Sequence, residues 1–260
     1  MTWLSQWLTY IKIRWMERLQ YPWDFAFATT GMFIIDFIGP LFVLVFYNTG
    51  ATIPGWTQWE LILLQGIFSL ISGIIFTLFW GMLYKTSSLV RNGTIEIFRI
   101  RPISTLRHLA MHCYNEQDTG QIFAGLIIIA TAATQLDITT AGALQAALYA
   151  IPGFLFLTGF TILGAALHVY FTKIPRLAAI ATDLITKYSK FPKEAFTTAR
   201  HSLVSLSPLF LVNYYPTKAL LKQPISPTNY AYSLLTGAGT LIIGLIYWHH
   251  ALRTYDGAHG

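Results

Sequence analysis

Three side chains of metal-binding type recur at a spacing of four residues in the middle of the chain. His108, His112 and Glu116 share one face if this segment is helical, and Cys113 lies beside them. A structural zinc site needs a closed set of four ligands, which this pattern does not supply. We therefore favour a polar turn of helix with hydrated histidine and glutamate side chains, and we predict no metal site.

One carboxylate interrupts an otherwise apolar stretch. Asp36 is the single charged residue within residues 25–47. A charge at the centre of a membrane-spanning helix costs about 2.5–3.5 kcal/mol on insertion scales, so this side chain must face protein or water. A place in a substrate path and a buried structural hydrogen bond explain it equally well, and both interpretations stay open.

The sequence lacks the common catalytic signatures. It has no Gly-x-x-x-x-Gly-Lys-Ser/Thr loop, no His-Glu-x-x-His, no Gly-x-Ser-x-Gly and no dinucleotide-binding glycine pattern. We predict no catalytic residue in this chain and no cofactor bound by it. The single cysteine, Cys113, excludes an intrachain disulfide.

The composition is that of a membrane protein. Of 260 residues, 54% are hydrophobic and 11% are charged, whereas soluble domains carry about 25% charged residues. A soluble enzyme is excluded, because so few charges cannot cover a water-exposed surface. The net charge of +6 does not indicate nucleic-acid binding, since the basic residues are dispersed between apolar runs and mark topology instead.

The apolar runs match the thickness of a bilayer, which needs about 20 residues of helix for a core of roughly 30 Å. We predict an all-α polytopic membrane protein with one domain, residues 1–260, and six transmembrane helices. The predicted spans are 25–47, 61–84, 119–136, 142–168, 177–188 and 230–248, of which 177–188 is short and contains Asp183.

An amphipathic helix is predicted over residues 1–20. The apolar face carries Trp3, Leu4, Trp7, Leu8 and Ile11, opposite Ser5, Gln6, Thr9 and Lys12. This pattern is typical of a helix that lies in the membrane interface. Arg14 and Arg18 interrupt the apolar face, and we expect them to reach lipid phosphates or a partner.

The segment between the second and third predicted spans mixes two kinds of residue. Ile95, Ile97, Phe98 and Ile100 are interleaved with Glu96, Arg99 and Arg101. Such a segment is too apolar for a solvated loop and too charged for lipid, so it indicates a protein partner. The alternation also fits a strand, but an isolated strand leaves its backbone unpaired. We favour a short helix that follows Asn92 and Gly93 and ends at Pro102.

Five stretches in order along the chain resemble the type 2 ABC transporter permeases, in the branch long catalogued as a domain of unknown function. They are GWTQWE (55–60), RNGTIEIFRIRPIS (91–104), KYSKFPKEAF (187–196), SPLFLVNYYPTKALL (207–221) and ALRTYDGAHG (251–260). The resemblance runs the whole length of the chain. It departs from the family pattern at Ile95-Glu96 and at Phe98-Arg99-Ile100, which affects the partner surface more than the family.

The resemblance implies a six-span permease subunit of a type V fold exporter. Such a subunit pairs with a second permease, identical or paralogous, and with a dimer of cytoplasmic ABC ATPases that bind ATP and Mg²⁺. The region 87–107 then contains a coupling helix, and residues 1–20 form the connecting helix beside it. The ATPase-coupling residues implied are Gly93, Glu96, Arg99, Arg101 and Pro102.

The resemblance also places residues 190–216 at the outer face, as a re-entrant hairpin that forms a gate. Its candidate gate residues are Pro192, Pro208, Tyr214, Tyr215 and Pro216, and we expect the prolines to interrupt helices. Counting Lys and Arg alone keeps Lys187, Lys190, Lys193 and Arg200 inside. With the resemblance, we place the hairpin outside and both termini in the cytoplasm, which leaves eleven of the 17 basic residues inside.

The leading hypothesis is an exporter subunit in the cytoplasmic membrane of a prokaryote, moving an amphipathic or lipid-linked substrate. The direction of transport follows from the resemblance alone. Two alternatives remain. One is a proton-coupled carrier that uses Asp36 with His168, although no internal repeat supports it. The other is a membrane scaffold whose basic loops recruit a partner.

Overall fold

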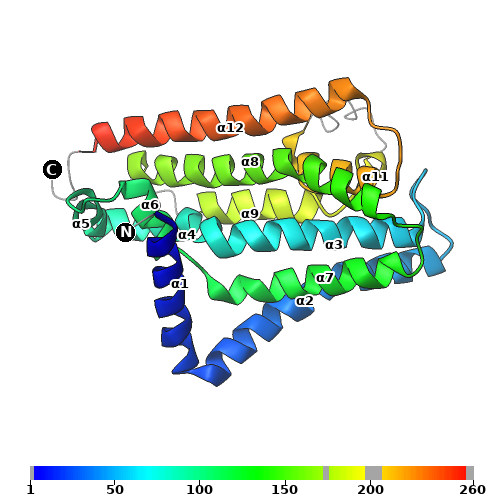
Figure 1. The fold of residues 1–260 in the computed structure, drawn as a ribbon, viewed down its shortest axis with the longest axis horizontal. Helices are drawn as coiled ribbons and strands as arrows, with labels where there is room; N and C mark the ends of the chain where they lie inside the picture. Colours follow the sequence, from blue (N-terminus) through cyan, green and yellow to red (C-terminus); the bar gives the residue numbers. More distant parts are fainter. Residues whose placement is uncertain (1–2, 172–175, 197–206, 256–260) are drawn as a thin grey trace.

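The computed structural model describes residues 3–171, 176–196 and 207–255, and this part of the chain is helical without strands. Four helices are long and apolar enough to cross a membrane. They are α2 (Pro22–Asn48), the continuous rod of α3 (Gln58–Ile75), η1 (Phe76–Trp80) and α4 (Gly81–Arg91), α8 (Thr140–Tyr170) and α12 (Pro227–Arg253). Figure 1 shows the rod, α8 and α12 running along the long axis of the molecule, with α2 inclined to them.

Two shorter helices lie alongside this frame. α7 (Thr119–Ala133) and α9 (Leu177–Tyr188) contain 15 and 12 residues. At 1.5 Å per residue they measure about 22 and 18 Å, less than the roughly 30 Å of a hydrocarbon core. The structure thus shows an all-helical membrane protein with four clear spans, and six crossings remain a prediction.

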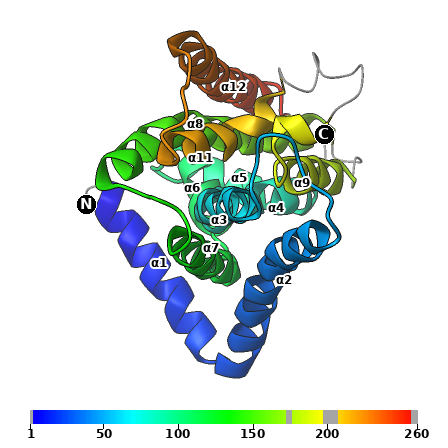
Figure 2. The same cartoon turned by 90° about the vertical axis from the view of Figure 1, so that its right-hand side faces the viewer.

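The core surrounds α3, which lies at the centre of the bundle in Figure 2. Leu63, Leu64 and Phe68 of this helix are fully buried. Glycines let the neighbouring helices approach closely: a Cβ added at Gly125 of α7 meets the backbone of α3, and one added at Gly159 of α8 meets the backbone of α12. These contacts hold α3 with α7, and α8 with α12, as two close-packed pairs.

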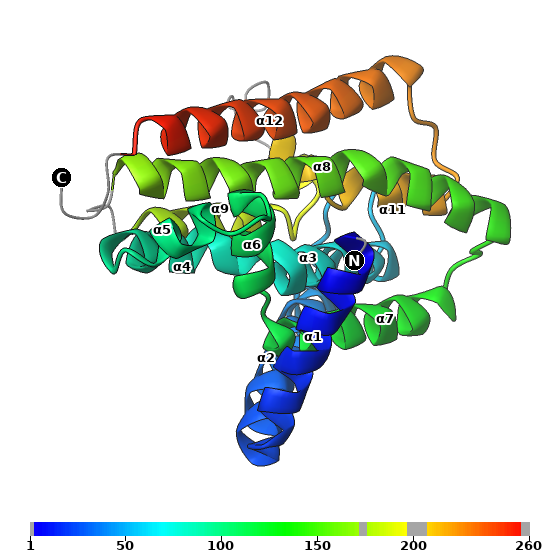
Figure 3. The same ribbon diagram turned by 60° about the vertical axis from the view of Figure 1, so that its left-hand side comes forward.

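Helix α1 (Trp3–Leu19) crosses the direction of the long helices, as Figures 1 and 3 show. Trp7 is buried, with its ring 6.3 Å from that of Phe79, whereas Leu8 is 58% exposed. Arg14 and Arg18 continue the inward stripe that contains Trp7. These arginines do interrupt the apolar face, but they meet a buried carboxylate of the same chain, Glu116, rather than the lipid phosphates or the partner that were expected.

One end of the bundle, called the α5 end below, is capped by short elements. These are α5 (Thr94–Arg99), α6 (Thr105–His112) and η2 (Glu116–Asp118). Gly93 precedes α5 with a left-handed φ of 68°, a conformation that favours glycine. Ile95 and Phe98 of α5 are buried in a second apolar core, together with Leu109 of α6. The segment that also fitted a strand is thus a helix.

The opposite end, the α11 end, carries η3 (Lys193–Ala195), η4 (Pro208–Leu211) and α11 (Tyr214–Leu220). The predicted hairpin 190–216 lies partly outside the described residues, because 197–206 are not described. Pro192 and Pro208 lie at the starts of η3 and η4. Pro216 does not interrupt a helix as expected, since it lies in the first turn of α11, where proline removes no helical hydrogen bond.

Candidate functional site

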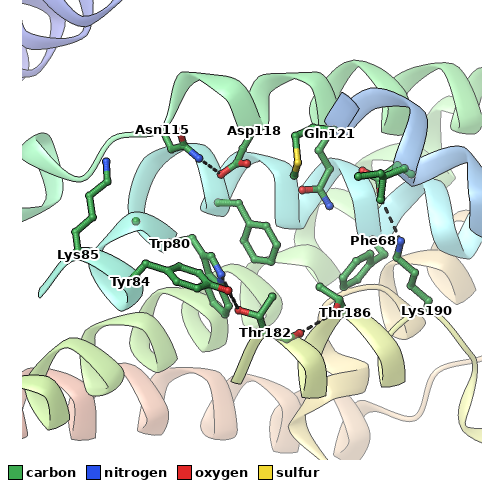
Figure 4. Close-up of a pocket in the computed structure, with 15 residues that line it drawn as sticks. Phe68, Trp80, Tyr84, Lys85, Asn115, Asp118, Gln121, Thr182, Thr186 and Lys190 are labelled. Atoms are coloured by element: carbon green, nitrogen blue, oxygen red, sulfur yellow. Dashed lines mark hydrogen bonds and ion pairs between the residues drawn. The ribbon is translucent and has the colours of Figure 1, made fainter. Parts of the chain in front are cut away.

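A cavity of about 530 Å³ opens between α2, the α3–α4 rod, the start of α7 and α9. Its lining combines apolar, aromatic and charged side chains (Figure 4). The lining residues are Met32, Ile35, Asp36, Phe68, Phe76, Trp80, Gly81, Tyr84, Lys85, Asn115, Asp118, Gln121, Thr182, Thr186 and Lys190. The volume and the mixed lining are typical of a small-molecule site.

Asp36 of α2 is 5% exposed and accepts a hydrogen bond from Nζ of Lys190 at 3.2 Å. Lys190 follows the end of α9, and its Nζ also lies 5.7 Å from the centre of the Phe68 ring. Gln65 of α3 donates to the backbone carbonyl of Lys190 at 3.4 Å. Asp36 therefore makes a buried structural bond and also lines the cavity, and its place in a substrate path stays a prediction.

Lys85 and Asp118 lie nearer the α5 end of the same cavity, and Figure 4 shows Lys85 and Lys190 on opposite sides of it. Asp118 accepts a hydrogen bond from Nδ2 of Asn115 at 2.9 Å. Burial is the main reason that the pKa of the Asp118 carboxyl rises to about 6. Within the described residues, neither Lys85 nor Asp118 makes an ion pair.

Aromatic side chains line the cavity between Lys85 at one end and Lys190 at the other, and they form its aromatic wall. Phe76, Trp80 and Tyr84 lie four residues apart along η1 and α4, and the rings of Phe76 and Trp80 stack at 4.4 Å. The indole nitrogen of Trp80 donates to Oγ1 of Thr182 at 3.3 Å, and the Tyr84 hydroxyl shares a hydrogen bond with the same oxygen. These two hydrogen bonds hold the side chains of Trp80 and Tyr84 against α9.

The predicted polar turn at His108, His112 and Glu116 is organised differently from the expectation. Helix α6 ends at His112, so Glu116 does not continue its face. The Glu116 side chain is fully buried and pairs with Arg14 and Arg18 instead of being hydrated. The described residues contain no group of three metal-type side chains placed to hold an ion.

His108 is likewise buried rather than hydrated, and its ring stacks on Phe98 at 4.1 Å. Burial is the largest cause of a lowered pKa for the His108 imidazole, and the Arg101 guanidinium adds to it. Arg101 Nη1 lies 3.3 Å from Nε2 of this histidine. The imidazole is therefore held neutral as part of the packing between α5 and α6.

The predicted coupling residues lie together on α5 and the turn after it. Glu96 and Arg99 both contact Tyr255: the Tyr255 hydroxyl donates to Oε1 of Glu96 at 3.3 Å, and Nη1 of Arg99 donates to the Tyr255 carbonyl at 3.3 Å. Pro102 is exposed, and the neighbouring Ile100 is 83% exposed. The chain thus presents an apolar, basic surface at the α5 end.

The predicted gate residues form a second cluster, at the α11 end. The Tyr214 hydroxyl donates to Oε1 of Glu194 at 2.6 Å, and the Trp56 indole donates to Oε2 of the same carboxylate at 3.1 Å. The Tyr215 ring lies edge-on to that of Tyr214 at 5.3 Å. Glu194 therefore ties the segment after α9 to α11 and to the start of α3.

Sequence reasoning missed Lys85, Asp118 and Lys190 as members of the cavity. Asp118 directly precedes the predicted span 119–136, and Lys190 belongs to the region predicted to lie outside. One signal was available: Thr182, Thr186 and Lys190 recur at a spacing of four and mark a polar stripe along α9. The partner of Lys190 was not visible in the sequence, because Asp36 lies 154 residues away.

Comparison with known proteins identifies the family. A family described as ABC-2 family transporter protein matches residues 32–259. No curated protein and no solved structure matches the chain. The family match includes every lining residue of the cavity, all of α5 and the cluster at the α11 end. The chain therefore belongs to the ABC-2 transporter family, as a multi-pass membrane permease of an ABC transporter.

Proposed function

We propose that this chain is the membrane subunit of an ATP-driven exporter that moves an amphipathic or lipid-linked substrate outward. ATP and Mg²⁺ are bound by a dimer of separate cytoplasmic ATPase subunits, and a second permease, identical or paralogous, completes the membrane part. The observation that carries this proposal is the family match over residues 32–259. The mixed lining of the cavity supports an amphipathic substrate, since it offers aromatic walls between charged ends.

In this proposal the α5 end faces the cytoplasm and α5 is the coupling helix. Two exposed isoleucines, Ile97 and Ile100, lie beside exposed Arg101 and Pro102. Exposed apolar side chains rimmed by charge are typical of a protein interface. Ile95 and Phe98 pack the opposite face of α5 into the core. A displacement of α5 would therefore also displace α4 and α6, which contribute to the same core.

Helix α1 acts as the connecting helix in this scheme. Arg14 and Arg18 bind the buried Glu116, and the Trp15 indole donates to the Tyr114 hydroxyl at 3.2 Å. Both contacts join α1 to the segment that leads into α7. A displacement at the α5 end is thereby transmitted to the helices that border the cavity.

The proposed topology has six crossings, with both termini on the cytoplasmic side of a prokaryotic cytoplasmic membrane. The short helices α7 and α9 make the third and fifth crossings, supported by protein on their α3 side rather than by lipid alone. Glu194 and Tyr214 belong to the outer gate formed by the region 190–216. Irregular backbone at this depth is acceptable because it contacts protein.

The test is the composition of the native assembly. The tagged chain is extracted from native membranes with mild detergent and crosslinker, and the proteins that remain bound are identified by mass spectrometry. We expect an ABC ATPase in stoichiometric amount, with substrate-stimulated ATP hydrolysis. Isolation of the chain without an ATPase would overturn the exporter proposal and favour a proton-coupled carrier. In that case Asp36→Asn would abolish a proton-dependent flux.

A further inference from the structure

We propose that the α5 end of the cavity binds the headgroup of an aminophospholipid, with Lys85 at the phosphate and Asp118 at the primary ammonium group. The acyl part then lies along the aromatic and aliphatic wall. This inference deepens the proposed function, because it names the class of amphipath that the exporter cavity accepts.

Of the four charged side chains that line the cavity, two form an ion pair with each other and two form none with any described residue. Asp36 and Lys190 neutralise each other at 3.2 Å. Lys85 and Asp118 line the same space, yet within the described chain neither has an ion-pair partner. One carboxylate oxygen of Asp118 accepts from Asn115, which leaves the other available.

A buried carboxylate without an ion-pair partner is costly, so Asp118 indicates a ligand, and the partly buried Lys85 lines the same cavity. Asp118 is 8% exposed, and its hydrogen-bond donor is the neutral amide of Asn115. Lys85 attracts it from beyond ion-pair distance, while Glu116 and Asp36 repel it. A ligand ammonium would supply the ion-pair partner. Lys85 is a compact point charge with three donors, which suits a phosphate.

The formal charges of the lining, two aspartates and two lysines, sum to zero. A zwitterionic headgroup preserves this balance, with its phosphate and its ammonium each opposite a protein charge. A purely anionic headgroup satisfies Lys85 but leaves Asp118 unpaired and repelled. The expected preference is therefore for an amine-bearing phospholipid over one with a glycerol headgroup.

The apolar part of the lining continues from this headgroup site. Phe76 and Trp80 of η1 line the cavity together with Met32 and Ile35 of α2, and Figure 4 shows Trp80 between Lys85 and Lys190. Burial of each methylene group contributes about 0.8 kcal/mol. The apolar part of the lining therefore suits the part of an acyl chain next to the headgroup better than a small polar solute.

The test measures lipid retention by the intact chain in the assembly that co-purifies with it. The protein is equilibrated with phosphatidylethanolamine or phosphatidylglycerol and bound lipid is counted by native mass spectrometry. We expect about tenfold stronger retention of phosphatidylethanolamine, a difference of roughly 1.4 kcal/mol. Asp118→Asn should remove this preference and keep phosphatidylglycerol binding. Lys85→Gln should weaken both lipids, and Lys85→Arg should restore them.

Matched controls are Asp137→Asn and Lys187→Gln, which remove the same charges from exposed positions outside the cavity. Equal retention of the two lipids by the unaltered protein would overturn the proposal. So would a loss of preference in the controls as large as in Asp118→Asn. Size-exclusion profiles check that each variant is folded. Because the assay needs no ATP hydrolysis, a lipid preference without a co-purifying ATPase would uphold the site and reject the exporter.

Discussion

Asp36 and Asp118 are two buried carboxylates on one cavity, and their partners differ. Asp36 has a lysine at 3.2 Å, whereas Asp118 has the neutral amide of Asn115 at 2.9 Å. Attraction to a cation offsets the cost of burying a carboxylate, while a neutral amide offsets it only in part. The first carboxylate therefore links helices, and the second is available to a ligand.

The raised pKa of Asp118 predicts how its replacement affects stability. Folding raises the pKa of this carboxyl from 3.8 to about 6, so the folded state binds the proton more tightly than the unfolded state. The associated stability is present below pH 3.8 and is lost as the pH rises through 6. Asp118→Asn, which stays neutral, should be more stable than the unaltered protein at pH 7.5 by up to about 3 kcal/mol.

Thermal unfolding in detergent at pH 7.5 and at pH 4 measures this effect. The two proteins should unfold at nearly the same temperature at pH 4, where the carboxyl is protonated. Asp137→Asn, an exposed carboxyl, serves as the control and should change little at either pH. A stabilising effect of Asp118→Asn that is the same at both pH values would contradict the prediction. A gain in stability together with a loss of lipid preference would show that Asp118 lowers the stability of the protein but is needed for lipid binding.

The ion pair of Asp36 and Lys190 predicts a non-additive pair of substitutions. Asp36→Asn leaves the partly buried Lys190 ammonium without an ion-pair partner, and it should cost about 2–3 kcal/mol of stability, less than for a fully buried pair. Asp36→Asn combined with Lys190→Gln should recover most of that loss. A double-mutant cycle measured by thermal or denaturant unfolding gives the coupling energy. Additive effects of the two substitutions would show that the contact contributes no stability.

At the scale of elements, local patterns determine much of the helical structure. The bounds of α9 match the apolar run 177–188, and α5 starts after Gly93 because a left-handed residue ends the preceding helix. Both signals are local in sequence. The inward face of α1 was not predictable in the same way, because the partner of Arg14 and Arg18, the buried Glu116, lies about 100 residues away. The cavity depends on such distant pairs throughout.

The start of α5 predicts a specific effect of replacing its glycine. Gly93 has a φ of 68°, a region in which a residue with a Cβ costs roughly 1–2 kcal/mol. Gly93→Ala should therefore lower stability by about 1 kcal/mol and weaken coupling, because it distorts the turn that orients α5. Gly31→Ala is the matched control, since a Cβ there meets nothing within 4 Å and α2 is helical at that point. Unfolding temperature and ATPase coupling are the measurements, and equal effects of both substitutions would reject the argument.

For the whole molecule, close glycine contacts define a frame of helices. α3 with α7, and α8 with α12, approach through glycines and form this frame. α2 buries only Asp36, Pro40 and Val43 of its 27 residues, and it borders the cavity. A glycine nevertheless brings α2 close to the frame, because a Cβ added at Gly120 of α7 meets the backbone of Thr29 in α2. Movement of α2 at the cavity therefore has to keep or break this contact as well as the ion pair of Asp36 with Lys190.

The exposed surface at the α5 end is where we propose that the ATPase binds. Ile100→Ala combined with Arg101→Ala removes an 83% exposed apolar side chain and the charge beside it, without touching the buried Ile95 and Phe98. If this surface binds the ATPase, the affinity of the permease for the ATPase should fall about tenfold or more, as expected for a contact worth at least 1.4 kcal/mol.

Arg107→Ala, which replaces an exposed arginine of α6, is the control. ATPase retention on the immobilised permease and substrate-stimulated hydrolysis are measured together. Loss of both in the double variant, with neither changed in the control, would locate the docking surface on α5, whereas unchanged retention would place it elsewhere at this end.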